Sequence, residues 1–152
     1  MPTLGDKKYF PVHKINYKPA PFVTGPSVKW PIVEVSFGGS TMGFTALIDS
    51  GASSSLLNAE IANVFGLKID NGITLRGAGV SGHFKYWITK DVEVTILGHN
   101  LVFDFMIPTE NSTLAWPCIL GHDSIFQVAK LEFTSFKEQF KIFFRKARVK
   151  KF

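Results

Sequence analysis

Cysteine and long apolar runs are scarce in this sequence, and both absences narrow the class of protein. Cys118 is the only cysteine among 152 residues, so a disulfide within the chain is ruled out and a reducing compartment is favoured. No apolar stretch approaches the roughly 20 residues of a membrane-spanning helix, and we expect no membrane partner. The first eight residues lack the apolar core of a secretory signal, so we expect a cytoplasmic protein.

Spacing typical of metal ligands is missing as well. The four histidines are scattered along the chain: His13, His83, His99 and His122. His122 follows Cys118 by four residues, but a cysteine before Ile-Leu-Gly is typical of a small buried side chain rather than a nucleophile. We therefore expect no metal and no other cofactor.

Positive charge is concentrated at one end of the chain. Residues 137–152 hold seven of the 17 Lys and Arg residues and one of the 12 acidic residues, so the remainder is close to neutral. Short basic tails are usually solvated, and nucleic acid is expected as a partner only through this tail. A protein built mainly to bind nucleic acid is disfavoured, because the body is neutral and shows no aromatic and basic motif on one strand.

Proline divides the chain into segments. Residues 1–28 contain five of the eight prolines and no sustained periodicity, which predicts an extended N-terminal arm. From Trp30 the pattern becomes that of a folded protein, in a chain with 45% hydrophobic residues. We expect one domain over residues 29–145, followed by a basic tail over 146–152.

Short β-rich runs dominate the predicted domain. Residues 32–37 and 44–48 flank Gly38-Gly39 and predict a hairpin. Asn58 is a good N-cap for a short helix over 59–65 that stops at Gly66. Further runs with strand character cover 92–96, 101–107, 117–121, 131–133 and 140–144. Many short strands with one or two short helices predict an all-β barrel or sandwich.

Asp49 stands out because an apolar strand leads directly into it. Residues 46–48 are Ala-Leu-Ile, and the tight turn Ser50-Gly51-Ala52 follows. A carboxylate at such a place needs partners, since burying a charge alone is costly. Glycine at position 51 lets the backbone approach and present its N–H to the carboxylate. Taken alone, Asp-Ser-Gly fits an Asx-type turn at a strand end equally well.

A second segment carries a related pattern, two aliphatic residues and a glycine before a polar residue and a short helix, over residues 118–126. Three segments occur in order: 47–53 with Asp-Ser-Gly-Ala, the glycine-rich 77–82, and 119–123 with Ile-Leu-Gly-His-Asp. Over about 30–144 the sequence resembles the retropepsins, the single-domain aspartic peptidases of retroviruses and of their cellular and bacterial relatives. The resemblance implies a retropepsin-like acid-protease barrel with a flap hairpin.

Aspartic peptidases hydrolyse peptide bonds with two carboxylates that share one proton and hold a water between them. Only Asp49 ends an apolar strand in the required turn. None of the other aspartates is followed by Ser-Gly or Thr-Gly: Asp6, Asp70, Asp91, Asp104 and Asp123. A homodimer with twofold symmetry would supply the second carboxylate from a second Asp49. The expected partners are thus a second copy and a peptide or protein substrate.

The resemblance also implies roles for individual residues. Asp49, Ser50 and Gly51 would be catalytic, with Ser50 bonding across the dimer and Gly51 holding the plane of the carboxylate. Gly121 would lie behind the catalytic turn, and Asp123 would cap the short helix or join an interface ion pair. The residues expected to bind substrate are in the turn and the flap: Ala52, Gly77, Ala78, Gly79, Val80 and Gly82.

One departure from the family and one likeness to its substrates leave alternatives open. His122 stands where retroviral enzymes often have arginine, which puts the usual salt bridge between subunits in doubt and would make dimerisation pH-sensitive. Phe10-Pro11 matches the aromatic–proline bonds that viral retropepsins cut, so the arm is either self-cleaved there or anchored by its aromatic residues.

The predicted function is that of an aspartic endopeptidase acting on extended peptide segments. The alternative is a non-catalytic module with the retropepsin fold that binds peptides or proteins, or that serves only for dimerisation. The intact Asp-Ser-Gly favours the enzyme, because a module that only binds has no need of that carboxylate.

Overall fold

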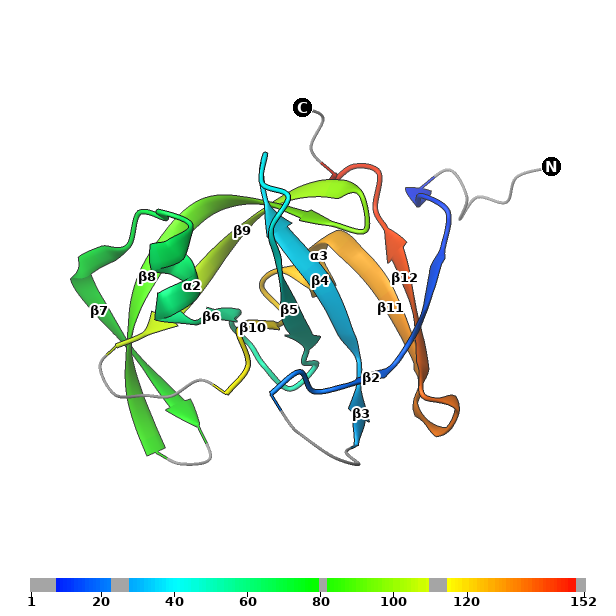
Figure 1. Ribbon diagram of the computed structural model, residues 1–152, viewed down its shortest axis with the longest axis horizontal. Helices are drawn as coiled ribbons and strands as arrows, with labels where there is room; N and C mark the ends of the chain where they lie inside the picture. Colours follow the sequence, from blue (N-terminus) through cyan, green and yellow to red (C-terminus); the bar gives the residue numbers. More distant parts are fainter. Residues whose placement is uncertain (1–7, 23–27, 80–81, 110–114, 150–152) are drawn as a thin grey trace.

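The computed structural model describes residues 8–22, 28–79, 82–109 and 115–149, with the backbone alone over 71–79 and 82–84 (Figure 1). Strands dominate this part of the chain. Six of them follow one another around a sheet that closes through a pairing of its first and last members. In order they are β4 (Ile32–Phe37), β5 (Gly43–Ile48), β10 (Cys118–Leu120), β6 (Leu56–Leu57), β9 (His99–Pro108) and β8 (Gly82–Ile96). The all-β barrel predicted from the sequence is confirmed.

The hairpin of β4 and β5 forms as predicted around Gly38-Gly39. The two strands pair antiparallel from Ile32↔Leu47 to Ser36↔Gly43. Gly39 has a φ of 78°, in the left-handed region that glycine adopts without steric cost. Alternate side chains, among them Val33, Val35 and Ala46, turn into the barrel core.

The short helix α2 (Ala59–Val64) also confirms its prediction. The Asn58 side chain accepts a hydrogen bond of 2.8 Å from the Glu60 backbone N–H, as an N-cap should. Gly66 follows the helix with a φ of 66°. Ala62 is its fully buried residue, so one face of α2 packs on the core.

The glycine-rich segment forms a long hairpin. β7 (Asp70–Gly79) pairs antiparallel with β8, and the last pair is Gly79↔Gly82. Gly77, Ala78, Gly79 and Gly82 thus lie on its two strands, whereas Val80 is outside the described residues. In Figure 1 the C-terminal end of β7, the first residues of β8 and the C-terminal end of β5 lie toward the same edge of the molecule.

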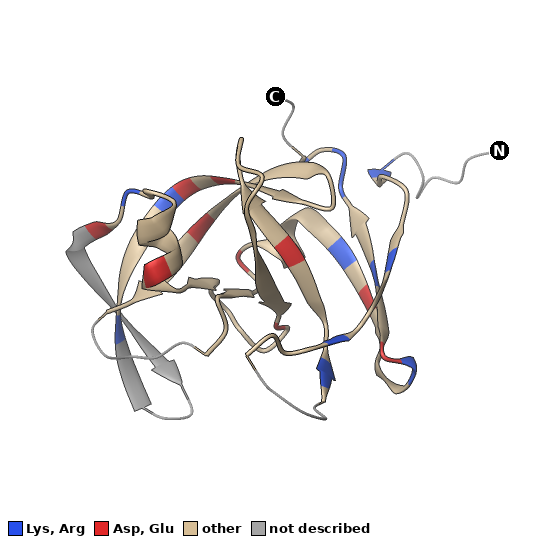
Figure 2. Cartoon of the chain, viewed as in Figure 1, with Lys and Arg blue, Asp and Glu red and all other residues tan. Residues whose placement is uncertain are grey.

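A smaller sheet packs beside the barrel. Within the described residues it has the order β1 (His13–Asn16), β12 (Gln139–Phe144), β11 (Ala129–Thr134), all antiparallel. Its β12 buries Phe140, Ile142 and Phe144 against the core. The elements that complete the described chain are β2 (Lys18–Pro19), β3 (Lys29–Trp30), α3 (Ile125–Val128) and the 3₁₀ turn η1 (Ser135–Lys137). Each strand of this sheet carries one lysine, Lys14 on β1, Lys130 on β11 and Lys141 on β12, and β11 also carries Glu132 (Figure 2).

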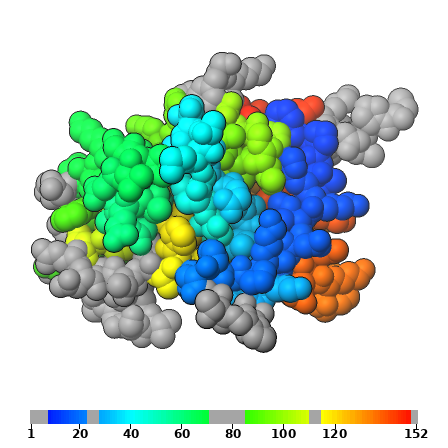
Figure 3. Space-filling view, viewed as in Figure 1, coloured from blue at the N-terminus to red at the C-terminus, as the bar shows by residue number. Residues whose placement is uncertain are grey.

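Residues 8–16 of the N-terminal arm lie beside the C-terminal strand β12 and the residues that follow it (Figure 3). The Phe10 backbone N–H donates to the Phe144 carbonyl at 2.9 Å, and Tyr9 forms a β-bridge with Arg145. Phe10 also packs against the core. Tyr9 and Phe10 thus pack on the body of the protein, and self-cleavage at Phe10-Pro11 stays a prediction.

Two histidines join this arm to the barrel. The Nε2 atoms of His13 on β1 and His99 at the start of β9 are 3.1 Å apart. The His99 ring lies 4.4 Å from that of Phe144 and 4.8 Å from that of Phe10. Burial, and then the neighbouring His13, lower the pKa of His99 below its ordinary value.

Acidification should therefore weaken this contact. A histidine whose pKa is lower in the folded state contributes stability above its unfolded pKa of about 6.5, and this stability is lost as pH falls below that value. We expect the urea midpoint of the wild type to fall more between pH 7.5 and 5 than that of His99→Gln. Lys14→Gln, which removes an exposed charge next to His13 on β1, should keep the wild-type dependence. Equal slopes for wild type and His99→Gln would contradict the prediction.

Candidate active site

Asp49 lies where the buried strand β5 reaches the surface. Ala46, Leu47 and Ile48 are buried, Asp49 is half-buried and Ser50 is exposed. Two backbone hydrogen bonds fix the end of the strand. Ile48 N–H donates to the Pro31 carbonyl at 2.9 Å, and Asp49 N–H donates to the Leu120 carbonyl at 3.0 Å. The carboxylate is thus presented at the rim of the barrel by a backbone held from both sides.

The turn after Asp49 has the expected geometry. Gly51 N–H donates to Asp49 Oδ1 at 2.9 Å, and Ala52 N–H donates to the Asp49 carbonyl at 3.1 Å. A Cβ at position 51 would lie 3.2 Å from the same Oδ1, so a side chain there would crowd the carboxylate. These contacts make an Asx-type turn, and they also leave one carboxylate oriented by a backbone donor, as both interpretations of the sequence require.

The second predicted segment lies directly behind this turn. β10 pairs parallel with β5, with Cys118 opposite Ala46 and Leu120 opposite Ile48. Gly121 follows, and a Cβ there would collide with the Ala52 carbonyl oxygen. Only glycine allows so close an approach, so the aliphatic-glycine pattern serves to dock β10 against the turn that follows Asp49.

Ser55 connects the two segments, and no pattern in the sequence predicted this role. Its side chain is fully buried, donates to Asp123 Oδ1 at 2.6 Å and accepts from the Gly121 N–H at 3.0 Å. Its oxygen also lies 2.6 Å from that of Ser124. Because a carboxylate only accepts, the single Ser55 proton points to Asp123, and Ser124 donates to Ser55. The one available signal was a serine directly before the apolar pair at 56–57.

The hydrogen bond from Ser55 therefore fixes the Asp123 side chain, which does not cap α3. The N-cap position of α3 belongs to Ser124, whose side chain makes no capping hydrogen bond. His122, between Gly121 and Asp123, directs its Nε2 to the Ser50 carbonyl at 2.6 Å. Each of the three residues after β10 thus contacts the segment that follows Asp49.

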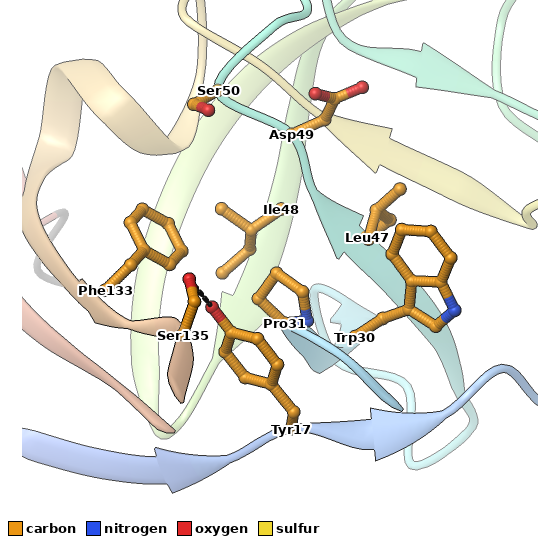
Figure 4. Close-up of a pocket in the computed structure, with 9 residues that line it drawn as sticks. All are labelled: Tyr17, Trp30, Pro31, Leu47, Ile48, Asp49, Ser50, Phe133 and Ser135. Carbon is orange, nitrogen blue, oxygen red and sulfur yellow. Dashed lines mark hydrogen bonds between the residues drawn. The ribbon is translucent and has the colours of Figure 1, made fainter. Parts of the chain in front are cut away.

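An open pocket of about 370 Å³ adjoins the turn (Figure 4). Its lining residues are Tyr17, Trp30, Pro31, Leu47, Ile48, Asp49, Ser50, Phe133 and Ser135. Asp49 and Ser50 lie at one end in this view, and Tyr17 lies at the other, with its hydroxyl 3.4 Å from that of Ser135. Three aromatic side chains come from segments far apart in sequence, which is why sequence patterns did not identify them.

Other chemistries find little support in the described part of the chain. No group of three or more His, Cys, Asp or Glu side chains there is arranged to hold a metal ion. Cys118 is completely buried, and burial raises the pKa of its thiol far above the ordinary value, so a thiolate nucleophile is disfavoured. Among the helices described, none has the length and apolar character needed to cross a bilayer.

The buried Ser55 gives a direct test of the support behind the turn. Ser55→Ala removes the partner of the Gly121 N–H, of Asp123 and of Ser124 at once, and unsatisfied buried groups cost about 1–3 kcal/mol. We expect the free energy of unfolding to fall by that amount in urea titrations at a fixed protein concentration. The exposed neighbour provides the control, because Ser53→Ala should change it by less than about 0.5 kcal/mol. Equal stability of the two variants would refute the network.

Comparisons with known proteins agree with this geometry. A family model described as aspartyl protease matches residues 33–123, more than half of the chain. The retroviral protease-like domain of Ddi1 from Leishmania major is 20% identical and has a TM-score of 0.51, over 68% of this chain and 82% of that one. EIAV protease, solved with a bound inhibitor, is 22% identical and has a TM-score of 0.48, over 66% of this chain and 89% of that one.

A search of curated protein sequences found no match. The likeness to the Leishmania domain concerns the fold, and the family match includes both Asp49 with its turn and the Ile-Leu-Gly segment behind it. With the closed barrel and the glycine-backed Asp-Ser-Gly turn, these findings make the chain a member of the retropepsin-like aspartic peptidase family.

Proposed function

We propose that the protein is an aspartic endopeptidase, active as a homodimer in which two Asp49 carboxylates activate a water molecule. The observation that carries the proposal is the position of Asp49. It stands at the end of a buried strand, is one of the residues that line an open pocket, and has one carboxylate oxygen that accepts a hydrogen bond from the Gly51 N–H at 2.9 Å. A carboxylate that served only to shape a turn would not need the backing of β10 and Gly121.

The second carboxylate has to come from elsewhere, because Asp49 is the one acidic residue among those that line the pocket. Other aspartates have different duties. Asp123 accepts from Ser55, and Asp104 accepts from the Asp91 backbone N–H at 2.8 Å. A second copy related by a twofold axis supplies the missing group without further sequence. Asp49, Ser50 and the exposed aromatic residues Trp30 and Phe133 then lie on the face that the second copy approaches.

The chemistry follows from a pair of carboxylates that carry one proton. The ionised member takes a proton from the bound water as the water oxygen attacks the peptide carbonyl. The protonated member donates a hydrogen bond to that carbonyl oxygen, and a proton then passes to the amide nitrogen as the C–N bond breaks. No covalent intermediate with the protein is required. The Gly51 N–H keeps each carboxylate turned toward its counterpart.

The β7–β8 hairpin is proposed to act as the flap. Gly77, Ala78, Gly79, Val80 and Gly82 would cover an extended peptide that binds as an added strand, through its own backbone N–H and C=O groups. Ala52 would contact the peptide from below, next to the catalytic turn. Ser50 would form a hydrogen bond to the other subunit beneath the carboxylate pair.

Replacement of the carboxylate tests the proposal and its alternative together. Asp49→Asn should keep the fold and the dimer but lower the hydrolysis of an unbiased peptide library by at least about 100-fold, because the general base is lost. Mass spectrometry of the digests and sedimentation of the variant measure the two properties. Asp91→Asn, an exposed position away from the pocket, is the matched control and should cleave as the wild type does. If the wild type binds peptides but cleaves none, the protein is the non-catalytic module instead.

A further inference from the structure

One peptide unit of the catalytic turn is bonded at both of its ends. The N–H of the peptide between Ser50 and Gly51 donates to Asp49 Oδ1 at 2.9 Å. The carbonyl oxygen of the same peptide accepts from His122 Nε2 at 2.6 Å. The C=O and N–H groups of a trans peptide lie in one rigid plane and point in opposite directions. A donor that holds the Ser50 oxygen therefore also sets the direction in which the Gly51 N–H points.

His122 is itself held in place. Its backbone N–H donates to the Ala52 carbonyl at 2.9 Å, and its own carbonyl accepts from the Gln127 side chain at 2.9 Å. Its ring stacks on that of Phe126, with centroids 4.7 Å apart and planes at 24°. The Gln127 and Phe126 contacts come from α3 and the Ala52 contact comes from the turn, so the imidazole is held from α3 as well as from the turn.

The ring nitrogen that faces Ser50 must carry a proton, because a carbonyl oxygen only accepts hydrogen bonds. Nε2 carries its proton both in the imidazolium form and in one neutral tautomer. The bond to Ser50 therefore persists whether the ring is charged or neutral. His122 is also exposed, so its replacement leaves no cavity in the core.

We propose that His122 is a positioning residue for Asp49, acting through the Ser50–Gly51 peptide. This inference rests on the proposed function, in which the Asp49 carboxylate is the catalytic group. The His122 N–H stops the peptide plane from rotating. It also polarises the peptide, which strengthens the bond from the Gly51 N–H to the carboxylate, since hydrogen bonds in a chain reinforce one another by roughly 10–30% each. We call this pair of hydrogen bonds, from His122 to the Ser50 oxygen and from the Gly51 N–H to Asp49, the relay. In a dimer it is present once in each copy.

The sequence context explains why this residue can reach the turn. Gly121 brings β10 so close to Ala52 that the next residue bonds to the turn through both its backbone and its side chain. A short side chain at 122 would make the backbone bond alone. The imidazole therefore adds a hydrogen bond to the Ser50–Gly51 peptide, which the bond from the His122 backbone N–H to Ala52 does not reach.

Two replacements separate the N–H donor from the rest of the side chain. His122→Phe keeps a flat ring that can stack on Phe126 but has no donor for the Ser50 oxygen. His122→Gln keeps an N–H donor on a chain of similar reach but has no ring. Both change an exposed position, and we expect their urea midpoints to match the wild type.

Steady-state kinetics on a peptide substrate provide the first measurement. His122→Phe should lower kcat about 10-fold or more, since small misplacements of a catalytic group have effects up to about 100-fold. Its KM should change less than about twofold, because the residue does not touch the substrate. His122→Gln should stay within about threefold of the wild-type kcat. Wild-type kcat in His122→Phe, or equal losses in both variants, would overturn the inference.

The amide resonance of Gly51 in ¹⁵N-labelled protein provides a second measurement that needs no activity. A bond to a carboxylate shifts this proton downfield, so His122→Phe should move it upfield while His122→Gln leaves it near the wild-type position. An unchanged Gly51 resonance in His122→Phe would sink the relay even if the protein proves to be a peptidase. If the wild type cleaves nothing but the resonance moves as expected, the proposed function fails and the relay stands.

Discussion

The hydrogen bond from the Gly51 N–H to the Asp49 carboxylate is the contact on which the rest of this site depends. A charge delivered to the surface by a buried strand needs donors, and backbone N–H groups are donors that do not swing away. To hold that one N–H in place, the chain brings β10 alongside β5 and places a glycine where any side chain would collide with the turn. The pairing of strands in the barrel thus packs β10 and Gly121 against the turn that follows Asp49.

Behind this contact the polar groups form a connected set. The Leu120 carbonyl accepts from the Asp49 N–H, and the Ser55 hydroxyl oxygen accepts from the Gly121 N–H. His122 donates from its backbone N–H to the Ala52 carbonyl and from its ring to the Ser50 carbonyl. Asp123 and Ser124 complete the environment of the Ser55 hydroxyl. Each buried group has a partner, which is the condition under which a polar network in a core adds rigidity rather than cost. Rigidity at this point suits the proposed role of Asp49, whose carboxylate would pair with the Asp49 carboxylate of a second copy.

Local patterns in the sequence predicted the local parts of this structure. The β4–β5 hairpin follows from two β-rich runs around Gly38-Gly39, and α2 follows from Asn58 and Gly66, because these signals act within a few residues. The tight turn after Asp49 was predicted for the same reason. By contrast, β1 lies in a proline-rich segment without periodicity and is a strand because β12 offers it an edge. Ser55 and the aromatic walls of the pocket were missed because their roles depend on contacts between distant segments.

The central claim is that one active site draws Asp49 from two chains, and mixing of subunits tests it most directly. Wild type and Asp49→Asn would be mixed in equal amounts, dissociated by dilution, allowed to reassociate, and assayed per wild-type subunit. Random pairing places about half of the wild-type subunits with an inactive partner. The account therefore predicts that activity per wild-type subunit falls to about half, and falls further with excess variant. Activity per wild-type subunit that stays constant at every ratio would contradict it, because each chain would then carry a complete site.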